Sequence, residues 1–75
     1  MKRTPVNSTM VASLGYDEAT QTLEVEFVSN AEIYQYKAVP KEVFLDLLSA
    51  PSKGKYMRQR IMDHYETEKI SGKAS

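Results

Sequence analysis

A short basic segment, Ser52-Lys53-Gly54-Lys55, holds the residues best suited to binding chemistry, because it stands where a second helix is expected to begin. Lysines at a helix start oppose the helix dipole, so local stability does not explain them. Free N–H groups at such a start attract an anion, and Gly54 allows a phosphate to approach the backbone closely. The segment predicts a phosphate-binding surface, whereas the simpler interpretation is a capped helix start with solvated lysines.

Arg58 extends this basic region along the same helix, where it falls beside the apolar stripe of Met57, Ile61 and Tyr65. Next to Tyr56 or Tyr65, its guanidinium would form a cation–aromatic surface that can grip a phosphate or stack on a base. It can equally lay its stem on apolar surface and keep its head in water. The candidate nucleic-acid-binding residues are Lys53, Gly54, Lys55, Tyr56, Arg58 and Arg60.

Catalytic and metal-binding chemistry have little support in the sequence. His64 is the single histidine, and it has no serine or cysteine nucleophile beside it. Because the chain has no cysteine, it offers neither a disulfide nor a thiolate metal site. The carboxylates are spread along exposed alternations instead of converging as metal ligands do. We therefore expect a non-enzymatic binding module with no catalytic residue, no metal site and no cofactor.

The formal net charge is zero, but the charged residues are unevenly distributed. Residues 17–32 carry five acids and no base, whereas residues 53–60 carry four bases and no acid. Local fields decide what a surface attracts, so this asymmetry matters more for partner choice than the total charge.

Neither a secretion signal nor a membrane-spanning segment is indicated. Residues 1–5 include charges but have no apolar run behind them, unlike a signal peptide. The longest apolar run is far shorter than the about 20 residues that span a bilayer. We expect a cytoplasmic protein with no membrane partner.

Three strands are expected to precede the helices. Residues 9–16 are rich in β-branched and apolar types, and residues 22–28 alternate cleanly between apolar and acidic types. Residues 32–39 make the third strand, after a turn in which Asn30 can adopt a left-handed conformation. Short turns between consecutive strands favour a meander.

Strand parity assigns the two tyrosines of the third strand to the core. Burying Tyr34 and Tyr36 beside Leu23, Val25 and Phe27 leaves the intervening polar residues in solvent. The opposite parity would bury Gln35 and Lys37 at a large desolvation cost, so it is disfavoured. We expect the tyrosine hydroxyls to reach polar partners where the helices meet the sheet.

Pro40 ends the sheet and suits the first position of a helix over residues 41–48, and Ser52 can cap a second helix over residues 53–65. The predicted fold class is therefore α+β, with a three-stranded antiparallel meander followed by two helices packed on one face (βββαα). Residues 1–66 would form a single domain and residues 67–75 a flexible C-terminal tail. The predicted core includes Leu23, Val25, Phe27, Tyr34, Tyr36, Phe44 and Ile61.

The chain resembles the KTSC domain, a family that occurs at the C-terminus of some lysyl-tRNA synthetases and as stand-alone small bacterial proteins. The resemblance covers about residues 6–65 and rests on the order and spacing of Tyr16-Asp17, Tyr34-Gln35-Tyr36, Val39-Pro40, Ala50 and Ser52-Lys53-Gly54-Lys55-Tyr56. The synthetase context implies RNA binding. Two departures are a turn at residues 29–31 without glycine, and Arg58 where a small polar residue is more usual.

Two hypotheses of function follow. The first is an RNA-binding module that uses its basic second helix for phosphates. The second is a protein-interaction or self-association module that uses an open sheet edge or the groove beside the second helix.

Overall fold

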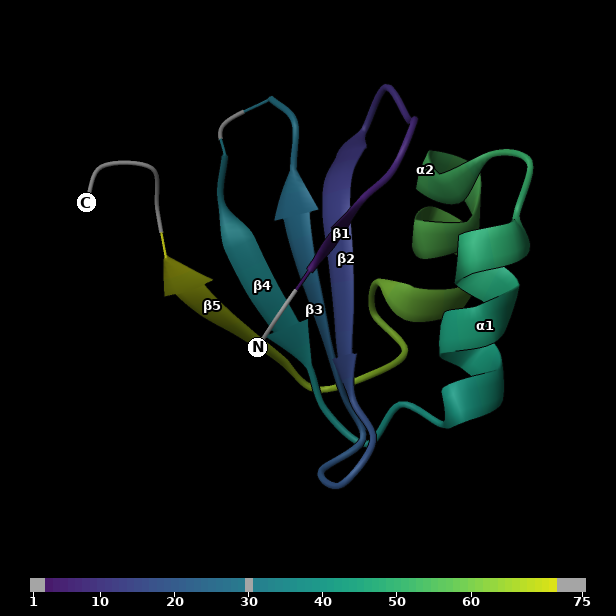
Figure 1. Cartoon of the computed structure of the whole chain (residues 1–75). Helices are drawn as coiled ribbons and strands as arrows, with labels where there is room; N and C mark the ends of the chain where they lie inside the picture. The colour runs from purple at the N-terminus through teal and green to yellow at the C-terminus, as the bar shows by residue number, and fades with distance from the viewer. Residues whose placement is uncertain (1–2, 30, 72–75) are drawn as a thin grey trace.

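Five strands form an antiparallel sheet in the computed structural model, which describes residues 3–29 and 31–71 (Figure 1). Each strand pairs with the next one along the chain, so the sheet is a meander. The strands are β1 (Thr4–Pro5), β2 (Val11–Asp17), β3 (Thr22–Phe27), β4 (Ile33–Tyr36) and β5 (Thr67–Ser71). The helices are α1 (Lys41–Ser49), α2 (Lys53–Tyr56) and a π-helical turn, η1 (Met57–Ile61), which continues α2.

The predicted three-stranded meander is wrong, because one further strand is added at each edge of the sheet. At two residues, β1 is too short to show any alternation, and its Pro5 is tolerated because it lies on an edge strand. β5 pairs with β4 and occupies the first part of the segment expected to be a flexible tail. The residues after Ser71, and Asn30 in the expected turn, lie outside the described part of the chain.

The sequence does not predict β5, because the residues of this strand, Thr-Glu-Lys-Ile-Ser, show no apolar alternation. Its first four residues are exposed, so no buried face imposes a pattern on them. The strand is held instead through its backbone pairing with β4 and by an ion pair between Lys37 and Glu68 at 3.4 Å. Hydrophobic periodicity reports burial, and an edge strand with little burial carries little of that signal.

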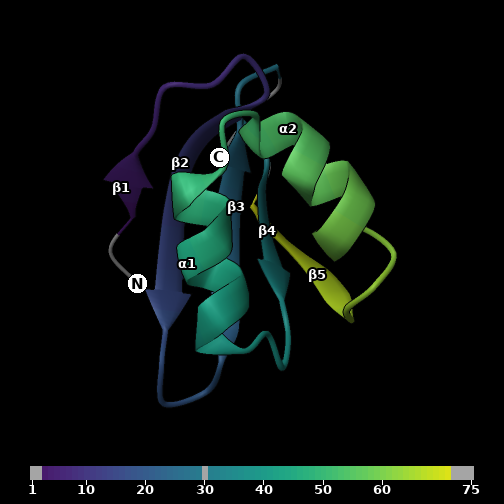
Figure 2. The ribbon, with the colours of Figure 1, turned by 90° about the vertical axis from the view of Figure 1, so that its right-hand side faces the viewer.

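The helices cover one face of the sheet, with α1 over β2 and β3 and α2 nearer to β4 and β5 (Figure 2). The second helix ends at Ile61 rather than at Tyr65. Met62 is already extended, its N–H donates to the Met57 carbonyl at 2.7 Å, and Asp63 has a left-handed φ of 69°. The chain reverses at this point, which brings β5 alongside β4. No helix in the described residues is long and apolar enough to cross a membrane.

The hydrophobic core lies between this sheet face and the helices. The register pairs Leu23 with Tyr36 and Val25 with Tyr34, so all four point toward the helices. A bulge in β2 near Ala12 shifts the register. Among the described residues, the buried apolar side chains are Val11, Leu14, Leu23, Val25, Tyr36, Val39, Leu47, Met57 and Ile61. Of the other predicted core residues, the structure places Phe27, Tyr34 and Phe44 against this cluster with partial exposure.

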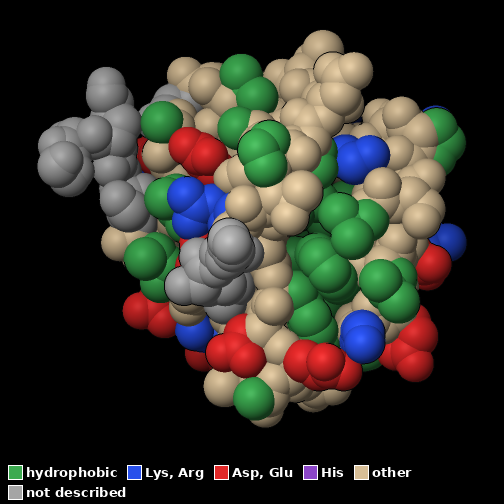
Figure 3. Space-filling model, in the orientation of Figure 1, with side chains coloured by type: hydrophobic (Ala, Val, Ile, Leu, Met, Phe, Trp, Pro, Cys, Tyr) green, Lys and Arg blue, Asp and Glu red, His purple; other side chains and the backbone are tan. Residues whose placement is uncertain are grey.

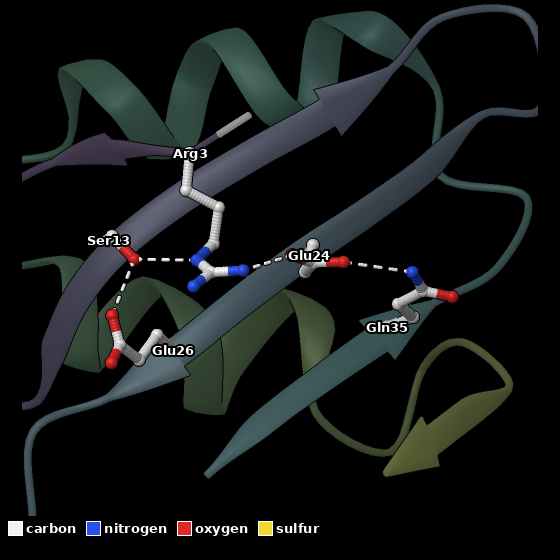
Figure 4. Close-up of polar contacts among 5 residues, drawn as sticks. All are labelled: Arg3, Ser13, Glu24, Glu26 and Gln35. Carbon is white, nitrogen blue, oxygen red and sulfur yellow. Dashed lines mark hydrogen bonds and ion pairs between the residues drawn. The ribbon is translucent and has the colours of Figure 1, made fainter. Parts of the chain in front are cut away.

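On the opposite face of the sheet, polar side chains form a hydrogen-bonded network instead of extending into solvent (Figure 4). Arg3, which directly precedes β1, forms an ion pair with Glu24, and its Nε donates to Ser13 Oγ at 2.9 Å. Gln35 Nε2 donates to the other oxygen of Glu24 at 2.9 Å, and Ser13 Oγ donates to Glu26 at 2.9 Å. Glu24 is therefore only 6% exposed, although strand alternation places it on the outer face.

These contacts control the ionisation of Glu24. Burial alone raises the pKa of this carboxyl, but the hydrogen bonds from Gln35 and Arg3, and the charge of Arg3, outweigh that effect. The pKa of Glu24 consequently lies below its ordinary value. A carboxylate charge on this face is thus neutralised locally by a cation from the N-terminal segment.

Candidate functional site

A pocket of about 340 Å³ lies where the N-terminal loop meets the start of α2. We call it the basic pocket; it is lined by residues 7–10, 51–55 and 58. Among the described residues, its charged lining residues are Lys53, Lys55 and Arg58, and no acid lines it. The structure thus brings three of the four predicted cations together and adds the polar loop of Asn7, Ser8 and Thr9, which were not among the predicted binding residues.

Local hydrogen bonds fix both walls of the basic pocket. Ser52 caps α2 by accepting from the Lys55 N–H at 3.4 Å, as the sequence indicates. Across the pocket, Ser8 Oγ accepts from the N–H groups of Met10 and Val11, each at 3.2 Å. Both walls are therefore held by a hydroxyl that orders the backbone around it.

The cations of the basic pocket differ in their burial and in their hydrogen bonds to the rest of the protein. Lys53 is half-buried, and its Nζ donates to the Ala50 carbonyl at 3.2 Å, which leaves two ammonium donors for a ligand. Lys55 and Arg58 are exposed. Within the described chain, none of the three forms an ion pair.

Gly54 is explained by packing. It is buried, and a Cβ at this position would lie 3.0 Å from Sδ and 3.1 Å from Cβ of Met10. The missing side chain lets α2 sit close to the N-terminal loop. A second reason, access for a phosphate, is not needed to account for the glycine.

Two predicted residues lie outside the basic pocket. Tyr56 and Arg60 do not line it, and Tyr56 instead lies near Asp46 of α1. Burial raises the pKa of the Tyr56 hydroxyl, and the Asp46 carboxylate raises it further, while Arg60 lowers it. The basic pocket thus includes Arg58 but neither Tyr56 nor Tyr65, the aromatic residues expected beside it.

A larger cavity of about 590 Å³ adjoins the basic pocket on the helix side of the sheet. We call it the aromatic pocket, since three aromatic residues of β3 and β4 contribute to its lining. Its lining residues are Thr9, Met10, Phe27, Ser29, Glu32, Tyr34, Tyr36, Arg58, Met62, Asp63 and Thr67. The sequence does not predict this cavity, because the cavity depends on the early end of the second helix and on β5.

The two tyrosines of the aromatic pocket have different hydrogen-bonding states. Tyr34 packs edge-to-face on Phe27 at 5.6 Å, and its hydroxyl donates to Glu32 at 3.1 Å, an interaction that raises the pKa of Tyr34. Lys69 Nζ pairs with the same Glu32 at 2.8 Å. The Tyr36 hydroxyl makes no hydrogen bond with a described residue, so the expected polar partner exists for Tyr34 alone.

Tyr36 is 3% exposed, and burial, followed by the charges of Tyr34 and Asp63, raises its pKa to about 12. Its hydroxyl is therefore neutral at physiological pH and can both donate and accept a hydrogen bond.

Outside the two pockets, the face shown in Figure 3 has no comparable cluster of cations, and the described residues form no metal site. Blue and red side chains are interspersed on the face shown in Figure 3, without the charge segregation of the basic pocket. In residues 3–29 and 31–71, no three His, Asp or Glu side chains are grouped so that they could hold a metal ion. His64 is exposed.

The sequence profile of the KTSC domain matches residues 7–65. This chain belongs to the KTSC domain family. The matched span includes the whole basic pocket and every lining residue of the aromatic pocket except Thr67. Arg3 and β5 lie beyond it.

Relatives of this KTSC domain occur both as small proteins and inside large enzymes. An uncharacterized protein of Stutzerimonas stutzeri is 51% identical over 59 residues, which cover 79% of this chain and 82% of that protein. A lysine–tRNA ligase of Nostoc punctiforme is 37% identical over 62 residues, 83% of this chain. The chain spans only 11% of that ligase.

A solved structure supports the same assignment. The crystal structure of a KTSC domain protein from Yersinia pestis superposes with a TM-score of 0.89 at 34% identity, over 93% of this chain and 97% of that one. This share exceeds residues 7–65, so the structural similarity extends beyond the matched profile.

Proposed function

We propose that this KTSC domain is a non-enzymatic RNA-binding module that holds phosphates in the basic pocket. The observation that carries the proposal is the convergence of Lys53, Lys55 and Arg58, three cations without ion pairs in the described chain, in a pocket with no acid. Arg58 offers a planar guanidinium fork and the lysines offer point charges, and both kinds of group bind phosphate. The hydroxyls of Ser8, Thr9 and Ser52 add neutral polar groups to the same pocket.

Relatives favour RNA over other polyanions. The lysine–tRNA ligase of Nostoc punctiforme contains a segment similar to nearly all of the KTSC domain, and its name gives tRNA as a substrate. We therefore take RNA as the polyanion bound by this chain. Because net charge is zero, long-range attraction is weak and the local cations supply the affinity.

The salt dependence of binding tests the number of contacts. Three phosphate contacts with single-stranded RNA predict a slope of about −2 for log affinity against log salt concentration. Affinity should then fall by about 15-fold between about 50 and about 200 mM salt. Fluorescence anisotropy with a labelled single-stranded RNA and with tRNA measures this directly.

Matched variants locate the binding surface. Lys55→Ala and Arg58→Ala should each weaken binding and reduce the salt slope by about one contact. Arg60→Ala is the control, because Arg60 lies on the same helix but outside the basic pocket. The proposal fails if the wild-type chain does not bind RNA at low salt, or if Arg60→Ala weakens binding as much as Lys55→Ala does.

A second function is favoured by the position of β5. This strand pairs only with β4 among the described strands, and its Ile70 is 45% exposed. An edge strand with a free backbone side can add a strand from a partner or from a second copy of the chain. Light scattering at two salt concentrations tests this: a salt-insensitive dimer that Ile70→Pro dissociates supports it, and a monomer at millimolar concentration excludes self-association.

A further inference from the structure

We propose that the aromatic pocket and the basic pocket form one bipartite site for a guanine nucleotide of single-stranded RNA, with the base in the aromatic pocket and its phosphate in the basic pocket. This inference rests on the proposed function and adds to it a base-recognition site. Residues Thr9, Met10 and Arg58 line both pockets, so the two cavities adjoin along a shared wall.

The Tyr36 hydroxyl is the first sign of a ligand. In the described chain, no fully shielded side-chain oxygen or nitrogen lacks a hydrogen-bond partner. Tyr36 is 3% exposed, and its hydroxyl has no hydrogen-bond partner among the described residues. The hydroxyl oxygen therefore cannot be fully shielded, and it must face open space. The aromatic pocket is the cavity that Tyr36 lines. A buried tyrosine usually satisfies its hydroxyl, and here a ligand in the pocket would do so.

The lining of the aromatic pocket suits a flat, partly polar ring. Phe27 and Tyr34 supply aromatic surface, while Met10 and Met62 supply adaptable thioether side chains. Bases of single-stranded RNA are recognised by stacking on aromatic or guanidinium planes together with hydrogen bonds to their edges. The volume of about 590 Å³ falls within the range typical of small-ligand pockets.

Charge sets the direction in which a nucleotide would lie. The aromatic pocket is lined by two acids, Glu32 and Asp63, and by one base, Arg58. The described residues that line the basic pocket include three bases and no acid. A phosphate is therefore attracted more strongly to the second than to the first, so the base enters the aromatic pocket. Arg58, which lines both, can contact the phosphate and cover one face of the base.

Asp63 favours guanine over the other bases. Its carboxylate forms no ion pair in the described chain, and Asp63 and Tyr36 line the same pocket. A carboxylate accepts two hydrogen bonds side by side, and guanine is the RNA base that presents two adjacent N–H donors on its Watson–Crick edge. Tyr36 can then donate to, or accept from, a neighbouring edge atom.

The experiment is a titration of the ¹⁵N-labelled protein, followed by amide chemical shifts, with GMP, AMP, guanosine and inorganic phosphate. We expect phosphate to shift amides of residues 52–55 and guanosine to shift amides of residues 34–36. GMP should shift both groups and bind at least about tenfold tighter than either fragment. AMP should bind several-fold more weakly than GMP.

Two variants test the assigned contacts. Tyr36→Phe keeps the ring and breaks no hydrogen bond within the described chain, so its thermal midpoint should not change while GMP affinity falls about tenfold. Asp63→Asn keeps a residue type that tolerates the left-handed backbone and should abolish the preference for GMP over AMP. Tyr65→Phe, outside both pockets, should leave GMP affinity unchanged.

The outcomes separate this inference from the proposed function. If GMP and phosphate bind equally and residues 34–36 do not respond, the base site is refuted while phosphate binding by the basic pocket stands. If AMP binds as tightly as GMP, the role of Asp63 is refuted. If neither RNA nor any of these compounds binds, the proposed function fails together with the inference.

Discussion

Replacement of Arg3 by alanine should destabilise the sheet more than removal of any exposed ion pair. The Glu24 side chain is 8% exposed and that of Arg3 is 24% exposed, so the pair is largely shielded from water. Arg3→Ala removes both the charge that faces Glu24 and the donor to Ser13 Oγ. Gln35 stays as a donor to Glu24, so the carboxylate keeps one of its two side-chain partners.

The expected loss follows from these contacts. A hydrogen bond to a charged group contributes about 1.5–3 kcal/mol, and the partial exposure of Arg3 favours the lower half of that range. We expect Arg3→Ala to reduce the free energy of unfolding by about 2 kcal/mol, which lowers the thermal midpoint by about 8–16 °C in a domain of this size. The control is Lys41→Ala. Its ion pair with Glu18 leaves side chains 53% and 69% exposed, so its loss should cost less than about 0.5 kcal/mol.

Acid should remove this difference between the two variants. The pKa of Glu24 in the folded state lies below its ordinary value of 4.5, so the carboxylate stabilises the fold fully above that pH. The contribution disappears as pH falls through the lowered pKa, because the folded protein must then take up the proton. The wild-type advantage over Arg3→Ala should be constant near neutral pH and shrink as the solution is acidified below 4.5.

Urea unfolding followed by far-UV circular dichroism is the suitable assay, because the chain has no tryptophan. A cycle with Glu24→Gln isolates the pairwise term, since glutamine keeps the shape of the side chain and removes its charge. Equal unfolding free energies for Arg3→Ala and Lys41→Ala at neutral pH would refute the reasoning. A difference that persists unchanged at pH 3 would also refute it, because the carboxylate would then not be the source.

Three further predictions concern packing, hydrogen bonding and topology. Gly54→Ala should lower stability by about 1–3 kcal/mol in urea unfolding, despite the higher helix propensity of alanine, because the new Cβ meets Met10; an added Met10→Ala should recover part of the loss, and no recovery would contradict this account. Tyr16→Phe should cost about 1 kcal/mol, since it removes the hydroxyl that donates to the Val39 carbonyl and keeps the ring stacked on Phe44 at 4.9 Å; a cost no larger than that of Tyr65→Phe would show that this hydrogen bond contributes little. Truncation after Glu66 should speed amide hydrogen exchange across β4, because it removes β5, whereas truncation after Ser71 should not; identical exchange in the two proteins would show that β5 does not protect β4.

The sequence predicts the middle of the sheet well because burial there imposes a pattern. Apolar and acidic residues alternate along β3, and this alternation correctly places Leu23 and Val25 toward the helices. The same alternation predicts Glu24 in solvent, where the structure buries it. The reason is a long-range contact: Arg3 folds over this face from an N-terminal segment whose sequence has no strand periodicity.

The site shows the same division between local and long-range information. Lys53, Lys55 and Arg58 are visible as a basic segment because they are close in sequence, and the capped start of α2 follows from Ser52. The aromatic pocket draws its lining from five parts of the chain, including η1 and β5, so no local pattern contains it. The one available signal was the pair of inward tyrosines, for only one of which the described chain supplies a hydroxyl partner.

Zero net charge argues against an anion-binding protein only if its acidic and basic side chains are paired to the same extent. In this chain they are not. The ion pairs of the described residues engage four cations: Arg3, Lys37, Lys41 and Lys69. The remaining described cations are those of residues 53–60, which form no ion pair there. Acids such as Glu24 and Glu32 are neutralised within the fold, so part of the negative charge in the total does not act on an approaching ligand. The positive charge of the basic pocket does act on it, and this difference makes the pocket attractive to phosphate at a balanced overall charge.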